Sequence, residues 1–523
     1  MLFKKTREKN VVNVSVTGSD TEDSLLEDTG METSYLKKAK ILSDAIDDIG
    51  FGKYQVGLFI VSGFGWLSDN AWPVVTSLIL NRVKEVDGVH PPRESLGPLL
   101  TLAQNVGLLA GALFWPLTAD LYGRKWAFNF TFLWIAIWAI VAGSSPNFAA
   151  LGVFCAFWSF GVGGNLPVDS AIFLENLPTK QRYLLTVLSC FWAIGQVIAN
   201  GIARGLVANF ACSDDGSPCY KKDNKGWRYF LFTMGGFAFL MFLARFLFNL
   251  MESPKFYMAN GDNASAIKVL HRIAQINGKT TELSVDDLEA IDEKYSVKKE
   301  EHFRFFSSKK LFIDKLRLFN MGHIRACFAT KRLCISSSMV IFTWGIIGLA
   351  FPLYNAFLPY YLETRGNANK PLSVNETYRN SLIVAAIGVP GALLAGLLVE
   401  LRIGRKGALS ISLVLTGVFL YASTTAKTPD ANLGWNCAFT FLSNIMYGVL
   451  YAYTPEIFAT KIRGTGVGLA ASANRLLGIF SPVIAICADL TTSAPIFVSG
   501  ALFILAGLLA ICYPYESRGK VSL

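Results

Sequence analysis

Long apolar segments recur along this chain and constrain its fold more than any other feature. Twelve of them are predominantly apolar and about 20 residues long, enough to cross a hydrocarbon layer about 30 Å thick. We expect spans at 54–80, 97–119, 127–143, 148–174, 184–208, 227–250, 333–361, 378–400, 407–425, 435–455, 466–488 and 493–513. A chain in hydrocarbon must satisfy its own backbone hydrogen bonds, which helices do. The sequence therefore predicts an all-α, polytopic membrane protein.

Charge is scarce, and its distribution indicates how the chain is oriented. Only 16% of the residues are charged, whereas soluble proteins average about 25%. The net charge of +10 fits either a polyanion partner or the excess of bases in the cytosolic loops of membrane proteins. Bases gather in short loops on one side, at Arg124 and Lys125, at Lys180, and at Arg405 and Lys406. That side is therefore expected to be cytosolic, and no nucleic-acid partner is expected.

A polar segment divides the spans into two sets of six. We expect a cytosolic tail at 1–50, a six-helix bundle at 51–251, a cytosolic linker at 252–330, a second bundle at 331–513 and a cytosolic tail at 514–523. The first tail contains SDTEDSLLED, a polar composition typical of disorder. The linker contains ASAIKVLHRIAQI, whose apolar spacing predicts a helix.

Two features of the opposite, non-cytosolic loops suggest covalent modification. Cys212 and Cys219 share one polar loop, where either a disulfide or two free thiols can exist. Asn375 begins the triplet Asn-Glu-Thr, the acceptor pattern for N-glycosylation. We regard both as candidate sites.

An internal repeat relates the two sets of spans. The triplet Gly123-Arg124-Lys125 returns at 404–406, which is 281 residues later. Glu175 in ENLPTKQR returns as Glu456 in EIFATKIR at the same offset. Because each copy lies on the cytosolic side, the halves are parallel repeats, related by an axis along the membrane normal.

These motifs resemble those of the major facilitator superfamily. LTADLYGRK is similar to its loop signature between helices two and three, although Pro116 and Leu121 depart from the usual residues. TPEIFATKIRGTG resembles the sugar-porter signature, and ESPKF and YPYESRGK resemble two further blocks of that group. The resemblance implies twelve helices in two parallel six-helix repeats. It also implies transport by alternating access.

The loop motifs supply charges that can pair at the cytosolic ends of the helices. We expect such pairs to hold the two halves together there, and to break and re-form as the halves rock. Simple anchoring by the positive-inside rule is compatible with this role. The candidate gate charges are Asp120, Arg124, Glu175, Arg182, Glu400, Arg405, Glu456 and Arg463.

Other motifs indicate the branch of the superfamily. GVGGNLPV in helix four, CFWAIGQ in helix five and SANRLLGIFSP in helix eleven resemble the synaptic-vesicle-glycoprotein and organic-ion branch. Phosphate porters typically carry an Asp where this chain has Asn165, and the Gln pair of hexose porters is missing from helix seven. The chain resembles fungal membrane proteins that are loosely labelled sugar transporters.

Ionisable residues inside spans are functional candidates, because charge in a bilayer costs several kcal/mol. Asp69 is expected to carry a proton or to bind substrate, or else to be a satisfied acid near the outer mouth. Asp169 lies one helical turn from Asn165 and either shares such a role or pairs with a cytosolic base such as Lys180. Arg475, beside Asn474, is a candidate ligand for an anionic substrate, or else it neutralises a neighbouring acid. Arg204 and Arg245 are expected to snorkel to the interfaces.

Aromatic and amide side chains form a second group of candidates. The resemblance places helices one, four, seven and ten around a central cavity, and we select Trp344, Asn355 and Tyr447 as possible lining residues. Most membrane Trp and Tyr residues instead pack or anchor at interfaces. Pro352 and Pro359 flank Asn355, and proline permits a kink there.

Together these features predict a secondary active transporter of a small polar or anionic solute, with proton coupling through Asp69. The alternatives are a sugar or phosphate transporter, or a non-transporting nutrient sensor on the same fold. The spans hold no His, and we find no catalytic constellation and no P-loop. We therefore expect no enzyme, cofactor or metal site. We expect a monomer with cytosolic termini, in the plasma membrane or in a vacuolar or endosomal membrane.

Overall fold

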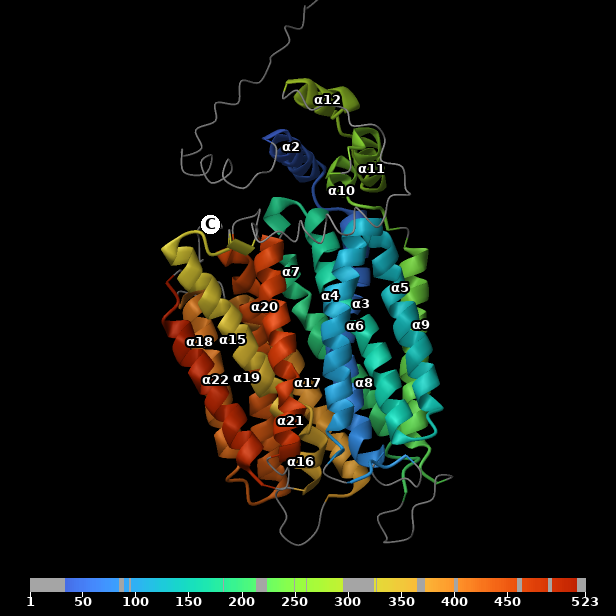
Figure 1. Ribbon diagram of the computed structural model, residues 1–523, viewed down its shortest axis with the longest axis vertical. Helices are drawn as coiled ribbons and strands as arrows, with labels where there is room; N and C mark the ends of the chain where they lie inside the picture. The colour runs from blue at the N-terminus through green and yellow to red at the C-terminus, as the bar shows by residue number, and fades with distance from the viewer. Residues whose placement is uncertain are drawn as a thin grey trace, which may run out of the picture.

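The structure is a computed structural model that describes most of the chain as helices (Figure 1). The described residues are 33–83, 89–93, 96–181, 183–212, 223–248, 250–259, 261–294, 324–325, 327–364, 372–398, 403–458, 463–487 and 492–514. Within these ranges all regular elements are helical, as expected.

The first half of the bundle, here called the N-half, lies on one side of the molecule (Figure 1). Its helices are α3 (Lys53–Val83), α4 (Leu99–Tyr122), α5 (Arg124–Gly143), α6 (Phe148–Glu175), α7 (Leu184–Val187), α8 (Ser189–Leu206) and α9 (Gly226–Leu247). Small residues allow close packing between them. A Cβ on Gly111 of α4 would lie only 1.9 Å from the carbonyl oxygen of Phe160 on α6.

The second half, the C-half, lies beside the first. Its helices are α15 (Lys331–Asn355), α16 (Leu358–Thr364), α17 (Val374–Leu398), α18 (Gly404–Ser423), α19 (Pro429–Ile457), α20 (Arg463–Gly478), α21 (Phe480–Cys487) and α22 (Ala494–Ile511). The seventh span is interrupted between Asn355 and Leu358, where the prolines predicted a kink. The eleventh is interrupted between Gly478 and Phe480, which was not predicted.

Three spans are more polar than the others, and this polarity has a structural reason. In the described part of the chain, nine helical segments are long and apolar enough to cross a membrane, and α3, α8 and α19 are not among them. These three carry buried polar residues such as Asp69, Gln196 and Asn436. Pairs between α8 and α17, and between α4 and α20, join the halves, so polar groups on such helices can face the other half instead of lipid.

One end of the bundle carries a small helical subdomain, and we call that end the linker side (Figure 1). It contains α2 (Thr33–Ile49), α10 (Pro254–Ala259), α11 (Asn263–Ile276) and α12 (Val285–Lys294). The buried ammonium of Lys38 on α2 pairs with Asp292 on α12 and lies 3.3 Å from Oδ1 of Asn263.

The expectation of a disordered first tail is therefore wrong for residues 33–49. Apolar side chains on one face of α2, including Leu42 and Ile46, are buried in the same core as Leu270 of α11. The predicted linker helix is confirmed by α11, which covers ASAIKVLHRIAQI.

Candidate functional site

The two strongest candidates from the sequence, Asp69 and Arg475, form an ion pair. Asp69 lies on α3, with 1% of its side chain exposed, and Arg475 lies on α20, with 20% exposed. The pair therefore joins the N-half with the C-half. The other carboxylate oxygen, Oδ2, accepts a hydrogen bond of 3.3 Å from the indole nitrogen of Trp192 on α8. Both oxygens of Asp69 thus have a donor.

Six aromatic rings, which we call the inter-half aromatic cluster, surround this level of the bundle. The N-half supplies Trp66 and Trp192, and the C-half supplies Trp344, Phe351, Tyr447 and Tyr451. The ring of Tyr451 lies 5.0 Å from that of Trp66 and 4.8 Å from that of Trp344, edge to face in both cases. Trp192 and Tyr447 are 4.6 Å apart. Such contacts are individually weak, so separation of the halves can expose the ring faces.

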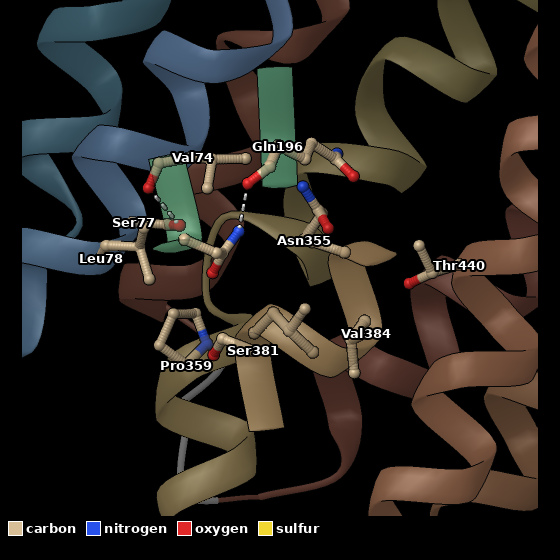
Figure 2. Close-up of a pocket in the computed structure, with 12 residues that line it drawn as sticks. Val74, Ser77, Leu78, Gln196, Asn355, Pro359, Ser381, Val384 and Thr440 are labelled. Carbon is tan, nitrogen blue, oxygen red and sulfur yellow. Dashed lines mark hydrogen bonds between the residues drawn. The ribbon is translucent and has the colours of Figure 1, made fainter. Parts of the chain in front are cut away.

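A small cavity lined by both polar and apolar side chains lies between the halves (Figure 2). Its lining residues on α3 follow Asp69 in the chain, so the cavity lies further from the linker side than Asp69. Its polar lining residues are Ser77, Gln196, Asn200, Asn355, Ser381 and Thr440. Gln196 connects this cavity with the ion pair, because its amide nitrogen donates a hydrogen bond of 3.2 Å to Oδ1 of Asn70, the residue after Asp69. None of the described lining residues is charged, so the cavity suits hydrogen bonding to neutral groups.

Asp169 lies elsewhere, in a second ion pair within the N-half. Its partner is Arg245 on α9, and the side chains of both residues are fully buried. The alternative of a pairing with Lys180 is wrong, because Lys180 is exposed in the short helix η2 (Thr179–Gln181). The expectation that Arg245 snorkels is also wrong, because it points into the bundle instead of along the membrane surface.

The remaining candidate ligands occupy both halves. Asn165 of α6 is buried, and its amide nitrogen donates a hydrogen bond of 3.4 Å to the hydroxyl oxygen of Ser68 on α3. The amide nitrogen of Asn474 donates a hydrogen bond of 3.1 Å to the carbonyl oxygen of Trp344. The indole nitrogen of Trp344 in turn donates a hydrogen bond of 2.8 Å to the hydroxyl oxygen of Thr454. Trp344 and Tyr447 therefore join the inter-half aromatic cluster, whereas Asn355 lines the cavity.

Of the gate charges, Arg124 and Glu175 form an ion pair. This pair joins α5 with α6 inside the N-half, and so it does not bridge the halves as expected. Arg405 lies in the first turn of α18. The side chains of Asp120, Arg182, Glu400, Glu456 and Arg463 lie outside the described part of the structure.

Cys212 and Asn375, two of the candidate modification sites, lie at the end opposite the linker side. Cys212 is disulfide-bonded, but Cys219 lies outside the described residues, so their pairing stays a prediction. Asn375 is exposed in the first turn of α17, and its glycosylation also stays a prediction.

Two further hydrogen bonds join the halves. The hydroxyl of Tyr378 on α17 donates 2.5 Å to the carbonyl oxygen of Leu78 on α3. The amide of Asn105 on α4 donates 2.7 Å to the carbonyl oxygen of Gly478 on α20. Both lie further from the linker side than the Asp69–Arg475 pair, because α3 and α20 each run away from that side.

Sequence reasoning missed several of these residues. Trp192 and Gln196 were overlooked because only helices one, four, seven and ten were expected to line the pathway. Their spacing of four residues on α8 was a usable signal, since it places both on one helical face. Tyr378 was not among the sequence candidates, and nothing in the sequence marks its partner, which is a backbone carbonyl.

Comparison with known proteins places this arrangement in a family. Residues 79–330 match the family model described as sugar (and other) transporter. An uncharacterized MFS-type transporter of Schizosaccharomyces pombe is 62% identical over 98% of this chain and 94% of its own length. MFS siderochrome iron transporter 1 of Ceriporiopsis subvermispora is 48% identical over 95% and 94%, respectively.

More distant relatives agree with the expected branch and fold. A synaptic vesicle 2-related protein of Xenopus laevis is 24% identical over 92% of this chain and 82% of its own length. The xylose transporter XylE from E. coli, in a partially occluded inward-open conformation, superposes with a TM-score of 0.66 at 16% identity, over 90% of this chain and 99% of that one. The family model and these relatives agree with the two helical halves of the structure. The chain is therefore a member of the major facilitator superfamily, an integral, multi-pass secondary transporter and not an enzyme.

Proposed function

We propose that this transporter moves a small anionic or polar solute together with a proton, and that Asp69 and Arg475 couple the two. The observation that carries the proposal is the ion pair between them. It lies at the boundary of the two halves, near the small cavity lined by amide and hydroxyl groups as well as apolar side chains, and among six aromatic rings. Buried charges in a membrane protein mark functional sites by default.

The ion pair makes proton binding and anion binding mutually dependent. While Asp69 is ionised, its carboxylate is paired with the guanidinium of Arg475, which is then not free to bind an anion. A proton on Asp69 removes that attraction and leaves Arg475 available to a carboxylate or phosphate of the solute. The solute's neutral groups then bind the amides and hydroxyls of the cavity. Anion affinity is therefore expected to fall as the pH rises, because ionised Asp69 competes with the solute.

The proposal also includes the orientation of the chain. The linker side, which carries α2 and α10–α12, faces the cytosol, as the positive-inside rule predicts. The protein acts as a monomer in the plasma membrane or in a vacuolar or endosomal membrane.

One candidate substrate class has specific support. The relative of Ceriporiopsis subvermispora, named as a siderochrome iron transporter, is 48% identical across nearly the whole length of both chains. A siderochrome therefore belongs in any substrate panel, beside carboxylates, sugars, phosphate and amino acids. A non-transporting sensor on this fold would show no uptake with any member of the panel.

The test uses the purified full-length chain in liposomes that contain a pH-sensitive dye. A transported member of the panel should acidify the lumen, and a protonophore should abolish accumulation. Asp69→Asn should lose accumulation but keep part of the exchange of labelled for unlabelled solute. Asp430→Asn, at an exposed carboxylate in the first turn of α19, is the matched control and should behave as the wild type. Accumulation that a protonophore leaves unchanged would contradict proton coupling.

A further inference from the structure

A second buried ion pair has no part in the coupling described above. Asp169 of α6 and Arg245 of α9 lie entirely inside the N-half, and neither side chain is exposed. Burying two charges is costly even when they are paired, and an ion pair adds little stability over apolar packing. The pair therefore calls for a functional explanation, which its surroundings supply.

Arg245 is held by groups other than Asp169. Its Nε donates a hydrogen bond of 3.1 Å to the carbonyl oxygen of Val61 on α3. One of its terminal nitrogens donates a hydrogen bond of 2.7 Å to the carbonyl oxygen of Phe128 on α5. Its guanidinium carbon also lies 3.8 Å from the ring centre of Phe128 and 4.3 Å from that of Phe132. Charge-assisted hydrogen bonds and cation–π contacts of this kind keep a guanidinium charged and in place. Arg245 therefore stays fixed whether or not Asp169 is charged.

Asp169, by contrast, is only half satisfied. Its Oδ2 binds Arg245, whereas its Oδ1 is buried with no hydrogen-bond partner among the described residues. The same is true of Oδ1 of Asn165, one helical turn away on the same face of α6. Each of these buried acceptors calls for a donor, such as a proton or a water molecule.

These groups form a polar path from the inter-half ion pair into the N-half. Asn165 donates to Ser68, which directly precedes Asp69 on α3. One turn before Asp69, Gly65 lies against Asp169, because a Cβ there would come within 1.6 Å of Oδ2. On α3 and α6 alike, the path from Asp69 to Asp169 leads toward the linker side.

We propose that Asp169 is a second proton-binding site, which receives the proton from Asp69 and passes it on toward the linker side. In this step the proton leaves the carboxyl group of Asp69, crosses by way of Asn165 and water, and binds Oδ1 of Asp169. Asp69 becomes ionised again and pairs again with Arg475, while protonated Asp169 keeps contact with the fixed Arg245. Among the described residues, Arg245 is the charged group that pairs with Asp169. On the neighbouring helices, α3 presents Gly65 to Asp169, and Phe128 and Phe132 of α5 pack against the guanidinium of Arg245.

This inference rests on the proposed proton coupling at Asp69, and infrared spectroscopy tests the two separately. The full-length protein in lipid is titrated with acid, and the carbonyl stretch of protonated carboxyl groups is recorded in H₂O and D₂O. We expect one band that disappears in Asp69→Asn and a second band that disappears in Asp169→Asn. Asp430→Asn, at an exposed carboxylate, should leave both bands unchanged.

A folded Asp169→Asn protein that keeps every band of the wild type would overturn the relay and leave coupling at Asp69 intact. Loss of neither band in either variant would overturn both proposals. If Asp169→Asn fails to fold, Asp169→Glu keeps the carboxyl group and should shift the second band instead of removing it, and an unshifted band would exclude Asp169.

The path itself is tested by Asn165→Leu, which removes the amide but keeps a similar volume. After a pH jump, the Asp169 band of this variant should appear at least tenfold more slowly, whereas the Asp69 band should appear at the wild-type rate. Equal rates for the Asp169 band in both proteins would contradict the path through Asn165.

Discussion

The carboxylate of Asp69 and the guanidinium of Arg475, 406 positions apart in the sequence, form an ion pair across the boundary between the two halves. The carboxylate of Asp69 is buried, whereas the side chain of Arg475 is 20% exposed. The indole of Trp192, a member of the inter-half aromatic cluster, donates a hydrogen bond to Asp69. A contact in this position senses both the protonation of Asp69 and the separation of the halves. The first prediction follows from it.

Removing either partner of this pair should destabilise the protein more than removing both. Arg475→Gln leaves a buried carboxylate without its cation, which typically costs about 3–5 kcal/mol. The double variant Asp69→Asn/Arg475→Gln has no unpaired charge and should recover most of that loss. Thermal unfolding in detergent measures the four proteins of this cycle. Additive effects of the two single changes would mean that the residues do not interact.

The hydroxyl of Tyr378 should hold the halves together on the side away from the linker. Tyr378→Phe removes its hydrogen bond to the carbonyl oxygen of Leu78, a type of bond worth about 0.5–1.5 kcal/mol. The population open on that side should therefore rise about 2- to 10-fold. A cysteine introduced at Ser77 in the cavity reports this opening through its labelling by a membrane-impermeant thiol reagent.

The control for this experiment is Tyr229→Phe, at an exposed tyrosine on α9. It should leave the labelling of the introduced cysteine unchanged. Equal labelling in the Tyr378→Phe protein and its parent would show that this hydrogen bond does not close the pathway.

A methyl group at Gly65 should disrupt the second ion pair. In Gly65→Ala the new Cβ would lie 1.6 Å from Oδ2 of Asp169, so Asp169 must move away from Arg245. We expect a loss of about 3–5 kcal/mol, because the charges are then buried without each other. Gly236→Ala, where a Cβ meets nothing within 4 Å, should change stability by about 1 kcal/mol or less and in the favourable direction. Thermal unfolding compares the two, and similar melting temperatures would contradict the contact.

The docking of α2 should depend on Lys38. Lys38→Ala removes a buried cation from Asp292 and Asn263, and we expect α2 to detach from α12 more often. Amide hydrogen exchange in residues 33–49 should become about tenfold faster, while exchange in α5 stays the same. Lys268→Ala, at an exposed lysine on α11, is the control. Unchanged exchange in α2 would mean that its apolar face alone holds it in place.

Much of the architecture could be predicted from the sequence, because hydrocarbon imposes a length and a polarity on every span. The expected span at 148–174 corresponds to α6 at Phe148–Glu175, and the expected kink beside Pro352 falls where α15 ends. The helix α2 was missed for the opposite reason. Its residues are polar enough to suggest disorder, and only the linker helices, far along the chain, offer the apolar surface that orders it.

The sequence by itself determined that this chain spans a membrane with two parallel helical halves, and it selected Asp69, Asp169 and Arg475 as candidate functional charges. Hydropathy and repeat spacing are properties of the sequence itself, so they can be read directly from the order of the residues. Only the tertiary structure decided the pairing: Asp69 with Arg475 across the halves, and Asp169 with Arg245 inside one of them. Partners on different helices are set by how those helices pack and rotate, and this information is spread over all of their contacts.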